Sequence, residues 1–171
     1  MFMIIAQLFG WASTFCSAVT YIFKKRRSIL FAKVSADLTS VIHYCMLGAF
    51  TGAVICGINV VRDTLYYNRD SKITKSIFCP LVFGVVTVIS CALTWLGWVS
   101  ILPTVGSCIG VVGLWMKKTL HIRLIMIPAL TLWLIYGVLI GSVPTILSNV
   151  LALCFLFVGL ARELSERKAN K

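Results

Sequence analysis

The chain has 171 residues, of which 60% are hydrophobic and only 12% are charged. A soluble domain is roughly 45–50% apolar and about 25% charged, so this composition excludes a water-soluble core and predicts a polytopic helical membrane protein. The net charge of +11 does not indicate nucleic-acid binding, because the Lys and Arg residues fall in four short clusters between apolar runs. We therefore expect a lipid bilayer as partner, and no nucleic acid.

Seven apolar stretches predict seven transmembrane helices and an all-α fold, although several are short of the roughly 20 residues that cross a bilayer. We expect these helices at residues 2–23, 34–48, 50–67, 77–98, 102–116, 124–140 and 143–162. The basic run 24–27 follows the first stretch, whereas in a signal peptide the positive charge comes first. The first stretch is therefore predicted to be an uncleaved helix.

The distribution of Lys and Arg predicts the orientation of these helices. With seven helices, the segments on one side of the membrane are 24–33, 62–75, 117–123 and 162–171, and they contain all sixteen Lys and Arg residues. Because positive loops stay in the cytoplasm, this partition predicts that the N-terminus is outside and the C-terminus inside.

The predicted helices divide into two three-helix units joined by a linker helix. We assign residues 1–68 to the first unit, 69–100 to a cytoplasmic loop and the linker helix, 101–162 to the second unit and 163–171 to a cytoplasmic tail. The two units have the same orientation, which predicts a parallel repeat about an axis along the membrane normal. Placing Gly48 on Gly141 puts His43 on Tyr136.

Several short motifs resemble the YgjV-type family of bacterial inner-membrane proteins. They are Ala6-Gln7-Leu8-Phe9-Gly10, the run SVIHYCMLG at 40–48, NVVR at 59–62 and LPTVG at 102–106. The chain departs from the family at Tyr136-Gly137, where a His-Asn pair is often found. The resemblance implies a bacterial inner (plasma) membrane location. Its three-one-three layout is similar to SWEET and PQ-loop transporters, and that analogy of fold favours solute transport.

Seven polar or aromatic residues in the predicted spans are candidates to line a central cavity that holds a small polar solute. They are Gln7, Trp11, His43, Asn59, Trp133, Tyr136 and Asn149. Four of them lie roughly 6–9 Å below the outer helix ends, and Asn59 lies about 13 Å below. The alternative is that these side chains only bond one helix to another, at around 0.6 kcal/mol for each bond.

His43 is the histidine expected inside a membrane span. An unperturbed pKa near 6.5 would suit a proton relay, but the nearest acid, Asp37, lies roughly 9 Å further along the same helix. A hydrogen-bonding role is therefore favoured. We expect His43 to face Tyr136, and His43→Ala to remove ligand binding while leaving the fold mostly intact.

Two charged pairs, Arg62-Asp63 and Arg162-Glu163, close the two units at their cytoplasmic ends. Arginines at such positions extend to the lipid headgroups and favour the C-terminal end of a helix dipole. The alternative is an inner gate built from these four residues.

The inventory of reactive residues argues against an enzyme. The chain has five acids, and its seven cysteines form no C-x-x-C pair, so we expect no catalytic site, metal or cofactor. The sequence favours a carrier or facilitator of a small polar solute. The alternative is a non-transporting protein that acts through lipid or protein contacts of its basic cytoplasmic face. A homo-oligomer is compatible with either.

Overall fold

The computed structural model describes the backbone of residues 2–20, 22–68, 74 and 76–169, and the side chains of these residues except 2–7, 167 and 169. In this part of the chain all regular structure is helical. The helices are α1 (Phe2–Thr20), α2 (Arg26–Met46), α3 (Phe50–Tyr67), α5 (Phe78–Leu93), α6 (Ile101–Trp115), α7 (Thr119–Leu139) and α8 (Val143–Ala169), with the 3₁₀ turn η1 (Trp98–Ser100) before α6. The prediction of seven helices and an all-α fold is confirmed for the described residues.

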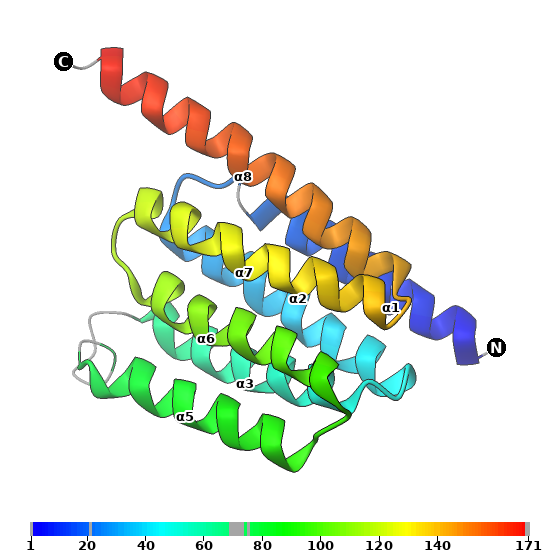
Figure 1. Ribbon diagram of the computed structural model, residues 1–171. Coiled ribbons are helices and arrows are strands. Elements are labelled where there is room, and N and C mark those ends of the chain that lie inside the picture. The colour runs from blue at the N-terminus through cyan, green and yellow to red at the C-terminus, as the bar shows by residue number, and fades with distance from the viewer. Residues whose placement is uncertain (1, 21, 69–73, 75, 170–171) are drawn as a thin grey trace.

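Six of the helices form a ring, and the seventh packs on its outside (Figure 1). Around the ring, α1 contacts α2, α2 contacts α3, α3 contacts α6, α6 contacts α7, α7 contacts α8, and α8 returns to α1. Helix α5 packs against α3 and α6. The ring therefore surrounds a central space that α5 does not border.

The turns at one end of the ring, here called the glycine end, contain Gly48, Gly97 and Gly141, with φ of +72°, +96° and +67°. A side chain at such φ values meets the backbone, so glycine suits these turns. After α2, the N–H of Gly48 bonds the carbonyl of Cys45, and the next N–H bonds the carbonyl of Tyr44. This is the Schellman arrangement that satisfies the last carbonyls of a helix.

The opposite end of the ring, here called the basic end, is held by Arg26, the first residue of α2. Its Nε donates to the Met116 carbonyl at 3.2 Å, its Nη1 to the Tyr66 carbonyl at 2.9 Å and its Nη2 to the Leu114 carbonyl at 3.1 Å. These carbonyls close α3 and α6, whose last turns would otherwise lack donors. A cation there also complements the negative end of both helix dipoles.

The start of α2 differs from the predicted one, because the helix begins at Arg26 and not at residue 34. The prediction assigned the basic residues to a loop. In the structure Arg26 bonds the ends of α3 and α6, and Lys33 is paired within the helix with Asp37. Both cations are therefore compensated inside a helix. The longer α2 places Lys33 on the same helix as Asp37, within the bundle.

The exterior of the ring is apolar, whereas much of its interior is polar. Phe15 and Phe31 are exposed, while Arg62 and Asp63 are almost completely buried. This distribution is typical of a bundle whose solvent is lipid. Four segments of the described chain are long and apolar enough to cross a membrane: α2, η1 with α6, α7 and α8.

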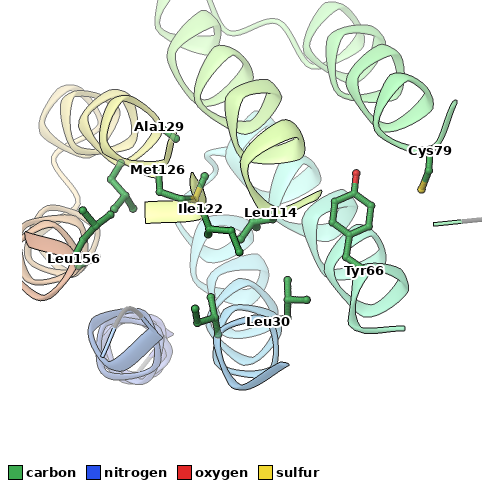
Figure 2. Packing of buried hydrophobic residues seen from close by; sticks show 11 residues of the cluster. Leu30, Tyr66, Cys79, Leu114, Ile122, Met126, Ala129 and Leu156 are labelled. Atoms are coloured by element: carbon green, nitrogen blue, oxygen red, sulfur yellow. The ribbon is translucent and has the colours of Figure 1, made fainter. Parts of the chain in front are cut away.

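The apolar core lies toward the basic end of the ring. Figure 2 shows Leu30, Leu114, Ile122 and Leu156 directed into the space between their helices, and all four are fully buried. A second, smaller apolar cluster lies toward the glycine end and contains Tyr44 and Tyr136. The polar interior lies between these two layers.

Candidate functional site

A cavity of about 60 Å³ lies inside the ring. Residues from α1, α2, α3, α6, α7 and α8 line it, and among the described residues α5 contributes none. One water needs roughly 10–15 Å³ measured in this way, so the cavity has space for a few waters or a solute of a few heavy atoms. The ring of helices thus contains a small cavity whose lining includes polar and charged side chains.

The structure brings some of the predicted site residues to this cavity. Asn59, Trp133 and Asn149 line it, and so does Arg62. Gln7 belongs to α1, but its side chain is outside the described residues. Three of the seven predicted cavity residues, one each from α3, α7 and α8, therefore lie at the same cavity.

The other predicted cavity residues lie elsewhere. Trp11 is 49% exposed on the outside of α1. His43 is buried, and its Nε2 lies 3.0 Å from the Ser142 hydroxyl. Tyr136 borders a second pocket, of about 340 Å³, at the glycine end. In the described part of the chain, none of these three is among the residues that line the central cavity.

Four charged side chains, here called the charge cluster, lie at the cavity or directly beside it: Lys33, Asp37, Arg62 and Asp63. Lys33 Nζ is 2.6 Å from Asp37 Oδ1, and Arg62 Nε is 2.6 Å from Asp63 Oδ1. The two pairs meet at the same cavity, which Lys33, Asp37 and Arg62 all line. Removing charges from water is costly, and pairing offsets only part of that cost.

Sequence reasoning missed the polar stripe along α2. Lys33, Asp37, Ser40 and Tyr44 all line the cavity and follow one another at intervals of four, three and four residues. Such spacing places side chains on one face of a helix. The pattern could have been found in the sequence, but the predicted helix began only after Lys33.

Three polar atoms on residues that line the cavity have no hydrogen-bond partner among the described residues. They are Asp37 Oδ2, Asn59 Oδ1 and Arg62 Nη1. Their residues are 5%, 3% and 1% exposed. A buried polar group without a partner costs about 1–3 kcal/mol, and more if it is charged. These atoms therefore offer one donor and two acceptors to a molecule inside the ring.

Other polar groups of the cavity are bonded to the protein. Ser13 donates to the carbonyl of Ala36 at 3.1 Å, and its hydroxyl lies 2.5 Å from that of Ser40. The Asn59 amide donates to the Ser107 hydroxyl at 3.4 Å. These bonds join α1 to α2 and α3 to α6, and they fix the walls between neighbouring helices.

A chain of hydroxyl contacts closes the ring above the cavity, on the side of the glycine end. Ser142 lies between His43 and Thr145, with oxygen–oxygen distance 2.7 Å to Thr145. Thr145 in turn lies 2.9 Å from the Tyr44 hydroxyl. This series of contacts connects α2 to the start of α8.

Tyr44 contacts both His43 and Tyr136, the two residues expected from the sequence to face each other. The ring centroid of Tyr44 is 5.5 Å from that of His43 and 6.2 Å from that of Tyr136. Trp133 completes the aromatic layer, with centroids 6.1 Å from Tyr44 and 5.7 Å from Tyr136. This layer separates the cavity from the pocket at the glycine end.

The four residues of the expected inner gate are divided between two places. Arg62 and Asp63 lie in the ring interior. Arg162 is exposed at the basic end, and Glu163 accepts a bond there from Arg123 Nη1 at 2.9 Å. Arg123 also donates to the Gly159 carbonyl. At this place Arg123 is buried, whereas Arg162 is exposed.

Within the described part of the chain, no group of three or more His, Cys, Asp and Glu side chains is placed to hold a metal ion.

Comparison with known proteins bears on the family of the chain. A family described as bacterial inner membrane protein, Imp-YgjV, matches residues 4–167. No curated protein and no solved structure gives a significant match. The match covers nearly the whole chain and agrees with the motifs around His43 and Asn59. The chain therefore belongs to the YgjV family of bacterial inner membrane proteins.

Proposed function

We propose that this protein carries or facilitates a small polar solute across the bacterial inner membrane, and holds it in the central cavity. The observation that carries the proposal is the set of unpartnered polar atoms of Asp37, Asn59 and Arg62 at a cavity inside an apolar exterior. Polar and charged groups within a membrane domain are costly, and they are typical of solute and ion pathways.

Correspondences between the two halves of the chain, of the kind that a parallel repeat would produce, support this proposal. Helices α2 and α7 both have 21 residues. The residues before them, Lys25 and Lys118, have nearly equal φ and ψ and lie 93 residues apart in the sequence. The turn glycines that follow the two helices, Gly48 and Gly141, are also 93 residues apart. The same spacing relates the starts of α3 and α8. The contacts around the ring have the same order in both halves.

Both halves of the chain line the cavity. At a spacing of 93 residues, six lining residues of the first half correspond to six lining residues of the second. The pairs are Ser13 and Gly106, Ser17 and Gly110, Lys33 and Met126, Asp37 and Leu130, Ser40 and Trp133, and Cys56 and Asn149. A solute site at the interface of two repeats is the plan of many secondary transporters.

In this proposal the basic end faces the cytoplasm, as the distribution of Lys and Arg predicts. The aromatic layer of Tyr44, Trp133 and Tyr136 then lies on the outer side of the cavity, and the apolar cluster around Leu114 and Ile122 on the inner side. Small movements of one repeat against the other would open these two layers in turn.

A thermal-shift screen of the purified protein against a library of small polar metabolites tests the proposal. A ligand that binds the folded state raises Tm, and we expect at least one such compound. Gly110→Ala should abolish its effect, because the added methyl group enters the cavity 3.4 Å from Met126 Cε and 3.7 Å from Arg62 Nη1. Gly84→Ala in α5 is the control, since that position is open.

Uptake of the identified compound into proteoliposomes then separates a carrier from a protein that only binds. The alternative function, lipid or protein contact through the basic end, predicts a different result. Exposed residues such as Lys117 and Lys118 would attract anionic lipid. Tm would then rise with phosphatidylglycerol and fall in Lys117→Gln/Lys118→Gln, while no metabolite would change it.

A further inference from the structure

We propose that the solute is a small zwitterion, whose ammonium group binds Asp37 and Asn59 and whose carboxylate binds Arg62. This inference rests on the proposed function and assigns the chemical class of the solute. It starts from the hydrogen-bonding inventory of the cavity and from the balance of its charges.

The unpartnered atoms match the two ends of a zwitterion. Asp37 Oδ2 and Asn59 Oδ1 are acceptors, and an ammonium group carries three donors. Arg62 Nη1 is a donor, and a carboxylate is the acceptor that a guanidinium binds best. Asp37, Asn59 and Arg62 all line the same small cavity. One short molecule with both groups would satisfy all three atoms.

The net charge of the site favours a solute without net charge. The cluster contains two cations, Lys33 and Arg62, and two anions, Asp37 and Asp63, joined as close pairs. An added ion would leave an uncompensated charge in a buried site, and that is costly. A zwitterion preserves the balance and still supplies one charge of each sign.

The fold itself does not require these four charges. At the 93-residue spacing, the positions that correspond to Lys33 and Asp37 are Met126 and Leu130. Buried ion pairs can often be replaced by apolar residues of similar volume with little loss of stability. The second half of the ring thus packs around apolar side chains where the first half has charges.

The same correspondence holds in the third helix of each unit. There Arg62 and Asp63 are matched by Phe155 and Leu156, and Leu156 belongs to the apolar core. A charge cluster confined to one half, with unpartnered atoms at a cavity, indicates recognition of a ligand rather than packing.

The size of the cavity restricts the solute to a short molecule. The cavity of about 60 Å³ has space for a few waters. A molecule with as few heavy atoms as glycine or alanine is comparable in size to those waters. Trp133 and Tyr44 border the same space and limit its width. Glycine and L-alanine are therefore the probes of choice.

Equilibrium binding of radiolabelled glycine and L-alanine to the purified, detergent-solubilised protein tests the inference. Acetate, methylammonium and glycerol serve as competitors of similar size that present only the anion, only the cation, or neutral hydroxyls. We expect binding of glycine or L-alanine, and competition at least tenfold weaker from each of the other three.

Two double variants test the assignment of the residues: Lys33→Met/Asp37→Leu and Arg62→Met/Asp63→Leu. Each should weaken zwitterion binding at least tenfold and keep Tm close to that of the unchanged protein. Asn59→Ala, which leaves both ion pairs in place, should also weaken it and serves if a double variant does not fold. Leu124→Ala, at an exposed position of α7, is the matched control.

The possible results separate this inference from the proposed function. If glycerol or acetate binds as well as glycine, or if the double variants fold and retain glycine binding, the zwitterion is excluded while a polar solute is retained. If none of the probes binds, the zwitterion is excluded, and the metabolite screen decides the proposed function independently.

Discussion

Arg62 Nε bonds the carboxylate of Asp63, its neighbour in the sequence, at 2.6 Å, and both side chains are almost completely buried. The bond leaves Arg62 Nη1 at the cavity, where it has no partner among the described residues. The pair thus neutralises the charge of the arginine while one of its donors stays available to a ligand.

The first prediction concerns the stability of this pair. Asp63→Ala should destabilise the protein by about 3–5 kcal/mol, since it leaves the Arg62 charge buried without compensation. The double variant Arg62→Met/Asp63→Leu should cost much less. Thermal denaturation of both variants in detergent measures the difference. An equal loss of stability in the single and the double variant would contradict the account of the pair.

The second prediction concerns the basic end. Arg26→Ala removes three bonds to the carbonyls of Tyr66, Leu114 and Met116, each worth about 1.5–3 kcal/mol as a bond to a charged group. Tm should fall strongly. Arg27→Ala is the control, because Arg27 is exposed and its guanidinium lies over the Tyr67 ring. Similar Tm values for the two variants would contradict the role of Arg26 in holding the ends of α3 and α6 together.

The third prediction concerns His43, whose imidazole bonds Ser142 and packs against Gly10. A Cβ built at Gly10 would lie 2.9 Å from the imidazole, so the contact is close. His43→Ala should lower Tm, through the lost bond of around 0.6 kcal/mol and the space it leaves. It should leave a solute-induced rise in Tm unchanged, because His43 lies outside the cavity lining.

Asn59→Ala is the matched comparison for His43, because Asn59 borders the cavity. It should reduce the solute-induced rise in Tm more than it reduces Tm itself. The opposite pattern, with ligand binding lost in His43→Ala and kept in Asn59→Ala, would return the site to the position expected from the sequence.

The fourth prediction concerns the turns at the glycine end. Gly48→Ala and Gly141→Ala should each cost roughly 1–2 kcal/mol, since an L side chain is strained at φ of +72° or +67°. Gly57→Ala is the control, because Gly57 lies inside α3 with open space around it, and alanine favours a helix. Thermal denaturation compares the three variants. If the Gly57 variant were the least stable, the turn geometry would be contradicted.

The sequence by itself determined the class of the protein, the number of helices and its family. Hydropathy is a local property, and a stretch such as 50–67 forms a helix in lipid whatever packs on it, because its backbone groups must be satisfied internally. Accordingly α3 begins and ends at the predicted residues. The basic segments and the motif around Asn59 can likewise be recognised from short stretches of sequence, without knowledge of how the helices pack.

Only the tertiary structure decided which polar residues meet. Whether a side chain faces lipid or a neighbouring helix depends on the rotation of its helix about the axis and on packing between distant segments. The sequence put Arg62 at a membrane surface and Trp11 at a cavity, but packing buries Arg62 at the cavity and exposes Trp11. Lys33 became a site residue for the same reason: α2 begins at Arg26, which bonds the ends of α3 and α6, and so Lys33 lines the cavity from the same helix as Asp37.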